Sequence, residues 1–276
     1  MDSANHVLAA EPLIRLGVFL GVLAGLMAWE YLAPRRALTL GRRRRWPGNV
    51  GVVAIDTVLV RIIFPAAAVG LALIAEAEGW GLLNMVAVSE WFAVVIVIVL
   101  LDLVIWTQHW LFHRVPLLWR LHRMHHADLD IDVTTGIRFH PVEILLSMVI
   151  KLGTVALLGA PALAVMIFEV LLNATSMFNH SNVWMPAGVD RVLRRILVTP
   201  DMHRVHHSIV ARETHSNFGF NLPWWDHLFG TYRAQPAVGH ERMTIGLPEF
   251  REPTELRLDR MLLQPLRQGS SGEKAE

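Results

Sequence analysis

Long uninterrupted runs of apolar residues, separated by shorter polar segments, dominate the chain. A bilayer core about 30 Å thick requires roughly 20 apolar helical residues to cross it. Five segments satisfy or approach this length, at residues 13–33, 50–75, 91–109, 142–158 and 162–177. The last two are joined only by Gly159, Ala160 and Pro161, which predicts a tight helical hairpin that either crosses fully or enters and returns. The pattern therefore predicts an all-α, multi-pass membrane protein of four to five transmembrane helices.

Positive charge is concentrated after the first of these segments, in Arg35, Arg36 and residues 42–45. Because short loops rich in arginine stay in the cytoplasm, the C-terminal end of the first helix is expected to face the cytoplasm. Counting the crossings from there places every histidine motif on the cytoplasmic side. The start of the chain lacks the basic segment and cleavage site of a secretory signal, so the first apolar segment is expected to remain as an anchor.

The amino-acid composition limits the kinds of binding and metal site that the chain can form. The net charge of +1 creates no overall field that would attract nucleic acid. Cysteine is absent, which excludes disulfides, thiolate zinc sites, iron–sulfur ligation and a cysteine nucleophile. Fourteen histidines remain. Any bound metal must therefore be held by imidazole, by carboxylate or by both.

Three histidine motifs stand out from the rest of the sequence. They are His109-x3-His113, His122-x2-His125-His126 and His203-x2-His206-His207. Residues three and four apart share a helix face, so each motif can direct two or three imidazoles to one point. A catalytic zinc ion takes about three protein ligands and keeps one position open. Eight imidazoles exceed that number, and imidazole also suits iron, so a pair of metal ions is the simplest site for them.

Polar residues within the apolar segments form two helical stripes. Asp102 lies on one face with His109 and His113, and Glu169, Asn173, Ser176 and His180 follow one another at steps of four, three and four. Ionisable groups inside a membrane helix are costly and usually face a functional interior. Asp102, Glu169 and Asn173 are therefore candidates to orient the imidazoles, with helix–helix hydrogen bonding as the alternative for the last two. His180, at the end of its stripe, is favoured as a ligand.

From residue 102 to residue 233 the sequence resembles the sterol desaturase and fatty acid hydroxylase superfamily. The matching segments are LWRLHRMHH (118–126), DVTT (132–135), RFHPVE (138–143), NHSN (179–182), TPDMHRVHH (199–207) and WDHLFGTY (225–232). Fatty acid 2-hydroxylase relatives have a further histidine four residues before His180, where this chain has Ser176. The resemblance is therefore to the sterol-desaturase-like branch.

The resemblance implies a helical membrane anchor beneath a cytoplasmic helical cap that holds two iron ions. It also implies that O2 and external electrons are used to hydroxylate or desaturate a C–H bond of a sterol, a fatty acyl chain or a related lipid. The implied metal ligands are His109, His113, His122, His125, His126, His180, His203, His206 and His207. The implied parts are residues 1–90 as N-terminal helices and basic loop, 91–235 as the catalytic domain, and 236–276 as a C-terminal cytoplasmic tail.

For several other residues near these motifs, the sequence supports two alternative roles. Proline at position 141 would begin the fourth helix, so His140 is either a helix cap or a ligand, and a supporting role is favoured. Glu143 is expected to pair with Arg138 or with an imidazole. His227 either hydrogen-bonds near the metals or packs in an aromatic hairpin, and His215 and His240 are interpreted as incidental. Residues 190–198 alternate arginine with apolar residues, which fits an interfacial helix and an ordinary solvated helix equally.

The partners follow from what the sequence lacks. It has no flavin or nicotinamide fingerprint and no haem domain, so electrons must come from a separate reductase or small redox carrier. Arg194 and Arg195 are candidates for its docking surface, although lipid phosphate fits them as well. Two other functions are weighed: a zinc-dependent membrane hydrolase, which lacks a glutamate within either H-x-x-H-H motif, and a non-enzymatic metal or haem carrier, which leaves most histidines unexplained.

Overall fold

The structure is a computed structural model that describes residues 7–267. Over these residues it is built from helices, and the only strand-like pairs are two isolated bridges, Pro34 with Val183 and Ser208 with Ile245. Five segments are long and apolar enough to cross a membrane. They are α2 (Glu11–Leu32), the segment Arg42–Asn84, α5 (Glu90–Arg114), α7 (Pro141–Leu158) and α8 (Ala162–His180). The predicted all-α, multi-pass architecture is confirmed.

The second of these segments is interrupted, which the hydrophobic pattern did not indicate. It consists of α3 (Arg42–Ile63), α4 (Ala67–Ala77) and the short 3-10 helix η1 (Leu82–Asn84). Helix α3 stops because Pro65 has no N–H and forces the preceding residue out of the helical region; Phe64 has φ −126° and ψ 68°. The helix also begins eight residues before the apolar run, within the arginine cluster.

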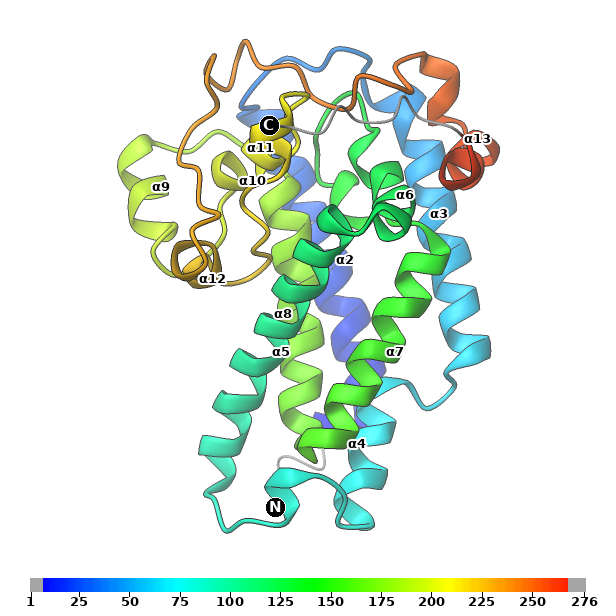
Figure 1. Cartoon of the computed structure of the whole chain (residues 1–276), viewed down its shortest axis with the longest axis vertical. Helices are drawn as coiled ribbons and strands as arrows, with labels where there is room; N and C mark the ends of the chain where they lie inside the picture. The colour runs from blue at the N-terminus through cyan, green and yellow to red at the C-terminus, as the bar shows by residue number, and fades with distance from the viewer. Residues whose placement is uncertain (1–6, 268–276) are drawn as a thin grey trace.

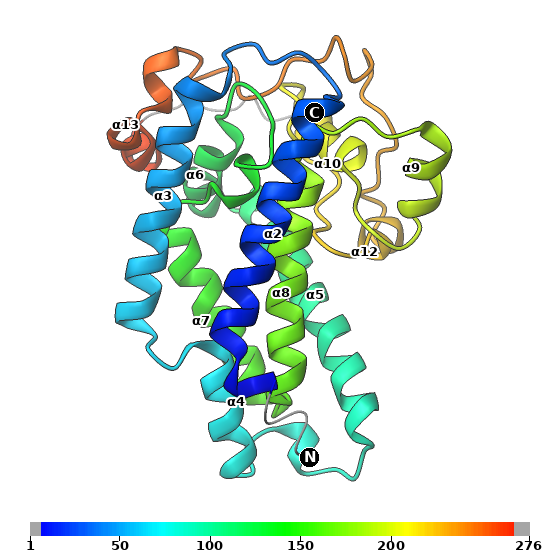
Figure 2. The same ribbon diagram turned by 180° about the vertical axis from the view of Figure 1, so that it is seen from behind.

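The long helices form an elongated bundle in which successive crossings alternate in direction (Figures 1 and 2). Helices α2, α5 and α8 run toward the end where the short helices gather, and α3, α4 and α7 run away from it. Side chains of α4, α5, α7 and α8 share one apolar core, which includes Val97, Leu101, Val165 and Phe168. This arrangement brings the C-terminal ends of α5 and α8, which carry His113 and His180, to the same end of the bundle.

Short helices form a cap over that end (Figure 1). They are α6 (Pro116–His126), η2 (Thr135–Ile137), α9 (Ala187–Leu193), α10 (Pro200–His206), α11 (Ala211–Thr214), α12 (Trp224–Leu228), η3 (Pro253–Leu256), α13 (Leu258–Leu263) and η4 (Gln264–Leu266). Helix α9 begins before the amphipathic segment predicted at residues 190–198 and ends within it. Beyond residue 235 the chain packs on the cap, with Phe250 against Ala127 and Met261 against Met124. Residues 268–276 of the predicted tail lie outside the described residues.

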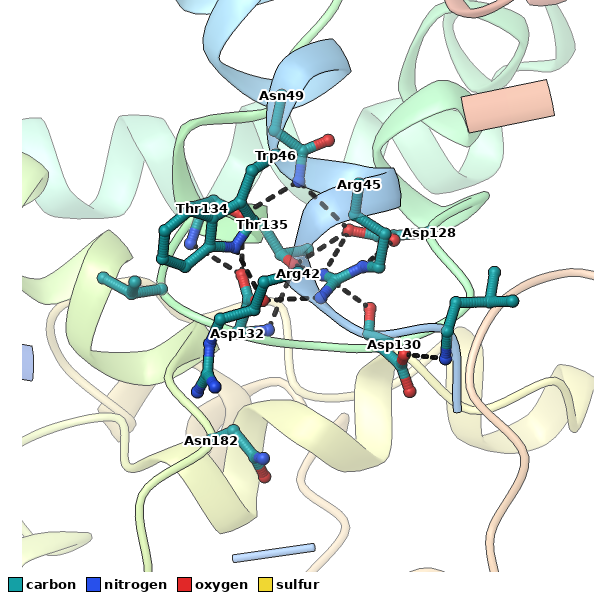
Figure 3. A network of polar contacts seen from close by, with 12 residues as sticks. Arg42, Arg45, Trp46, Asn49, Asp128, Asp130, Asp132, Thr134, Thr135 and Asn182 are labelled. Carbon is teal, nitrogen blue, oxygen red and sulfur yellow. Dashed lines mark hydrogen bonds and ion pairs between the residues drawn. The ribbon is translucent and has the colours of Figure 1, made fainter. Parts of the chain in front are cut away.

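A buried polar network fastens α3 to the loop that follows α6 (Figure 3). Arg45 is 0% exposed and donates to both carboxylate oxygens of Asp128 at 2.7 Å and to Asp132 at 2.5 Å. Asn49, one turn further along α3, donates to Thr134 at 2.9 Å. Burial by itself would raise the pKa of Asp128, but the guanidinium groups of Arg45 and Arg138 outweigh it and hold that pKa below its usual range. Part of the arginine cluster is therefore a structural element of the interior.

Candidate metal centre

A proline-directed turn brings the first two histidine motifs face to face. Val115 adopts the extended conformation expected before a proline, so α5 ends there, and Pro116 occupies the first position of α6, where its missing N–H costs nothing. Helix α6 consequently folds back on the end of α5. The Nε2 atoms of His109 on α5 and His122 on α6 lie 3.1 Å apart.

The remaining histidines arrive on α8 and α10. His180 is the last residue of α8, and its ring lies 4.3 Å from that of His203 on α10, centre to centre. Helix α10 starts at Pro200, and the Thr199 side chain caps it by accepting from the Met202 N–H at 3.4 Å. The cap fixes the first turn of the helix that carries His203 and His206.

All nine histidines singled out in the sequence come together in two adjoining groups. The first contains His109, His113, His122, His126 and His206, and the second contains His125, His180, His203 and His207. Within each group the candidate ligand atoms lie within 4.8 Å of one another. The rings of His126 and His207 stack at 4.5 Å and join the two groups. Every member is at most 6% exposed, so water does not solvate these imidazoles.

Hydrogen bonds fix the outward nitrogen of five of these rings. Nδ1 donates to a backbone carbonyl in His109, His125, His180 and His206, and to the Glu143 carboxylate in His122, at distances of 2.6–2.9 Å. A backbone carbonyl can only accept, so Nδ1 carries the proton in His109, His125, His180 and His206. Burial lowers the pKa of His122 to about 3 and the pKa of His125 and His206 well below the ordinary value, so these rings are neutral. The inward Nε2 atoms of the four rings bonded to backbone carbonyls therefore present lone pairs.

The inward nitrogens point at one another in a way that fits a shared cation. The Nε2 atoms of His109 and His122 are 3.1 Å apart, and those of His125 and His180 are 3.0 Å apart. In the pair His125 and His180 both Nε2 atoms carry lone pairs, which repel at this distance unless a positive ion lies between them. Metal–nitrogen bonds of about 2.0–2.1 Å at right angles would separate two ligand nitrogens by about 3.0 Å. The donor set therefore fits bound metal.

Further nitrogens of the two groups lack any protein partner. The Nε2 atoms of His113, His126, His206 and His207 are buried and form no hydrogen bond among the described residues. Unpartnered polar atoms are costly in a protein interior, and native proteins seldom keep several in one place without a ligand. Four such atoms within two small groups add a second, independent reason to expect ions here.

Some of the residues predicted to orient the imidazoles contact the histidines, and others bond to different parts of the structure. Glu143 pairs with the His122 imidazole, one of its two expected partners, at 2.7 Å. His140 is the N-cap of α7: its Nδ1 accepts from the Val142 N–H at 3.2 Å. Asp102 bonds the Trp225 indole at 2.8 Å and the Leu222 N–H at 3.3 Å. Asp102 thus holds α12 and the residues just before it against α5, and no imidazole is among its described hydrogen-bond partners.

The second polar stripe splits between two environments. Ser176 donates to the Gly136 carbonyl close to the centre. Glu169 instead lies 2.6 Å from Lys151 and 2.9 Å from Arg15, and Asn173 donates to the Glu169 carbonyl at 2.8 Å. Within the described residues neither Glu169 nor Asn173 bonds an imidazole. Cations on the two neighbouring helices, α7 and α2, determine where the Glu169 side chain pairs.

Three histidines and one arginine interpreted from the sequence have defined contacts. His215 is not incidental, because its Nδ1 lies 3.2 Å from Nδ1 of His113. His227 stacks on Tyr232 with ring centres 4.0 Å apart, in agreement with the aromatic-hairpin reading. His240 is buried 3.6 Å from the Asp201 carboxylate. The Arg194 side chain is buried and paired with Asp190, which argues against it as a docking residue for a redox partner.

Two phenylalanines missed by sequence reasoning separate the histidines from the apolar bundle. Phe139 stacks on His125 with ring centres 4.4 Å apart, and Phe220 lies 5.1 Å from His109. Both pack against the core shared by α5 and α8. Phe139 lies in the RFHPVE segment, but nothing in that segment indicates which side of the centre it would cover.

Comparisons with known proteins agree with this geometry. The family model for fatty acid hydroxylase matches residues 94–231. The chain is 34% identical over 145 residues to ornithine lipid hydroxylase from Rhizobium tropici, covering 52% of this chain and 43% of that protein. It is 29% identical over 142 residues to human alkylglycerol monooxygenase, covering 50% and 29%, and 30% identical over 156 residues to the Xenopus tropicalis protein, covering 56% and 33%.

The matched region spans less than half the length of each of these relatives. No solved structure matches the chain. The family model nevertheless covers half of the sequence and includes every histidine of the two groups. The chain therefore belongs to the fatty acid hydroxylase family.

Proposed function

We propose that the chain is a membrane-bound, non-haem di-iron oxidoreductase that hydroxylates a C–H bond of a lipid. The overall reaction would consume O2, two electrons and two protons and release the alcohol and one water. Hydroxylation is favoured over desaturation because the relatives are a hydroxylase and monooxygenases by name. Those names also favour a lipid as the substrate.

The observation that carries the proposal is the pairing of neutral, inward-facing imidazole nitrogens at 3.0–3.1 Å in two adjoining groups. Two groups indicate two ions rather than one. Iron is favoured over zinc because zinc has no redox chemistry, and hydroxylation by O2 requires a metal that supplies electrons. When bound, the iron pair would provide the electrons that activate O2 for attack on a C–H bond.

The residues of the chain have separate tasks in this reaction. The nine imidazoles hold the metals, and the acceptors of their outward nitrogens fix the ring orientations. Phe139 and Phe220 form an apolar wall on the side that faces the bundle and keep water from the centre. A lipid chain that enters from the bilayer would reach the metals past this wall.

The centre is proposed to lie on the cytoplasmic side. Arg42 begins α3 and Arg114 ends α5, both at the end of the bundle that carries the histidines, and Arg35 and Arg36 contact Asp201 and Asn182 there. This agrees with the rule that arginine-rich ends of membrane helices stay in the cytoplasm. A separate electron donor would then approach the cap from the cytoplasm.

Metal analysis tests the proposal directly. The purified protein should contain two iron ions per chain, and a Mössbauer spectrum should show a non-haem iron pair. His125→Ala should lose most of this iron. His240→Ala replaces a buried histidine outside the two groups and should retain it. Full iron loading in both variants, or a native protein that loads only zinc and remains active, would contradict the proposal.

Lipid profiling tests the reaction. Lipids from cells with the gene should contain species heavier by one oxygen atom that are missing from cells without it and from cells expressing His125→Ala. The incorporated oxygen should derive from O2, which labelling with heavy oxygen gas reveals. Products lighter by two hydrogens would instead assign a desaturase.

A further inference from the structure

The helices α9 and α12 stand to one side of the bundle, with α9 level with α10 and α12 lower, nearer to α5 (Figures 1 and 2). They and the loops beside them expose an unusual number of large apolar side chains, which we call the lateral surface. Its members and their exposed fractions are Val192 59%, Ile196 60%, Trp224 47%, Leu228 68% and Phe229 52%. A surface of this kind in contact with water would be expected to associate with another apolar phase.

The position of the lateral surface along α5 places it at the depth of the bilayer. The Trp225 indole bonds Asp102 at 2.8 Å, and the Phe229 ring stacks on Trp106 at 4.6 Å. Asp102 and Trp106 lie twelve and sixteen residues after Glu90, where α5 begins, or about 18 and 24 Å along a helix that rises roughly 1.5 Å per residue. A hydrocarbon core is about 30 Å thick. Helix α12 therefore contacts α5 below the cap-side edge of the membrane.

A groove of about 640 Å³ in this surface combines apolar and cationic groups. It is lined by Arg195, Trp224, Trp225, His227 and Leu228. The Trp224 indole donates to the Arg195 carbonyl at 2.7 Å and so connects the loop after α9 to α12. None of these five lining residues is acidic. Arginine recognises phosphate through paired hydrogen bonds, and tryptophan concentrates where lipid headgroups meet acyl chains.

We propose that the lateral surface is embedded in the cap-side leaflet and that its groove holds the phosphate headgroup of a bilayer phospholipid at Arg195. The apolar side chains of α12 and Ile196 contact acyl chains, and the exposed Arg195 guanidinium faces the phosphate. The surface adjoins a membrane helix, because Trp225 and Phe229 both contact α5. This assignment does not depend on the reaction proposed for the metal centre.

Spin labelling tests the depth of the surface. Because the chain contains no cysteine, Leu228→Cys and Val210→Cys can each be labelled at a single site in the otherwise native protein. Val210 is also an exposed apolar residue, at 41%, but it precedes α11 at the top of the cap. In phosphatidylcholine–phosphatidylglycerol vesicles, oxygen should relax the spin label at position 228 strongly. A water-soluble nickel complex should relax it weakly. The label at position 210 should show the reverse. Equal nickel accessibility at the two positions would overturn the proposal.

Retained lipid tests the groove. Arg195→Gln should keep several-fold less phospholipid than the native protein after detergent exchange, as measured by native mass spectrometry. Arg242→Gln removes another exposed arginine of the cap and should leave the retained phospholipid unchanged. Both variants should unfold at the native temperature, which separates loss of lipid from loss of fold. Equal retention by the two variants would show that Arg195 does not hold a headgroup.

Discussion

Two polar clusters are buried at the same end of this molecule, and they differ in how completely their atoms are paired. In the network of Figure 3, each guanidinium nitrogen of Arg45 meets an oxygen of the protein. In the histidine groups the outward nitrogens are bonded, but inward nitrogens face one another or have no partner. The first cluster is complete as a protein structure, whereas the second is complete only with ions. Pairing of the buried atoms, rather than burial itself, thus separates an anchoring site from a candidate reactive site.

The largest effect is expected from breaking the completed network. Arg45→Met would leave the buried Asp132 carboxylate without its cation and Asp128 with Arg138 alone, at 3.8 Å, and the loss of a buried partner typically costs about 3–5 kcal/mol. Thermal unfolding in detergent should show a large fall in the unfolding temperature, and added iron should not restore it. Arg44→Met changes an exposed neighbour and should have little effect. Similar unfolding temperatures in the two variants would mean that the network does not anchor the cap.

Removing metal should have the next largest effect, and only through the histidine groups. A ligand present at about 100 times its dissociation constant stabilises the folded state by roughly 2.7 kcal/mol. A strong iron chelator should therefore lower the unfolding temperature of the native protein. It should have a smaller effect on His125→Ala, which has lost a ligand of the second group. A native protein that is indifferent to the chelator would place the stabilising ion elsewhere.

Two buried carboxylates sharpen the comparison further. Glu143→Gln weakens the support of His122, and loss of such a support usually reduces metal affinity by about 10–100-fold. Glu169→Gln disturbs the pairing with Lys151 and Arg15, so it should reduce stability without changing iron affinity. Iron titration and thermal unfolding of both variants distinguish these results. Equal losses of iron affinity would show that the centre is coupled to the ion pairs between the membrane helices.

The smallest effect is expected at the start of α10. Thr199→Ala removes the side-chain cap of the helix that carries His203 and His206, and such a loss costs about 1 kcal/mol. The unfolding temperature should fall slightly, and Thr199→Ser should recover most of the loss because its hydroxyl can cap the same N–H. A fall as large as that of Arg45→Met would contradict the view that this hydroxyl serves mainly as a cap.

Spacing along the sequence was sufficient to single out the eight histidines of the three motifs, because helical periodicity directs each motif to one face, and His180 followed from its polar stripe. The same reasoning failed for the arginines. Residues 42–45 form one basic run, yet Arg45 is fully buried and Arg44 is exposed. The difference arises from Asp128, which lies 83 residues away. A partner that distant leaves no local pattern, so the network could not be predicted.

Glu169 shows a second limit of the same kind. Its step pattern placed it on the face of His180, and both residues do lie on α8. Its pairing is decided by Lys151 on α7 and Arg15 on α2, whose rotation relative to α8 the sequence does not specify. Similarly, Pro65 is present in the sequence, but the apolar residues on both sides of it favoured one continuous helix over residues 50–75, so the interruption was not predicted.

Because of the tight turn at Val115 and Pro116, the two histidine groups come together at different times during synthesis. Four of the five imidazoles of the first group lie between His109 and His126, so they meet as soon as α6 folds back on α5. The second group must wait for residues as far along the chain as His207. Contacts that are close in sequence form early and those that are distant form late. A growing chain would thus offer nearly all of one metal-binding pocket while the ribosome is still producing the other.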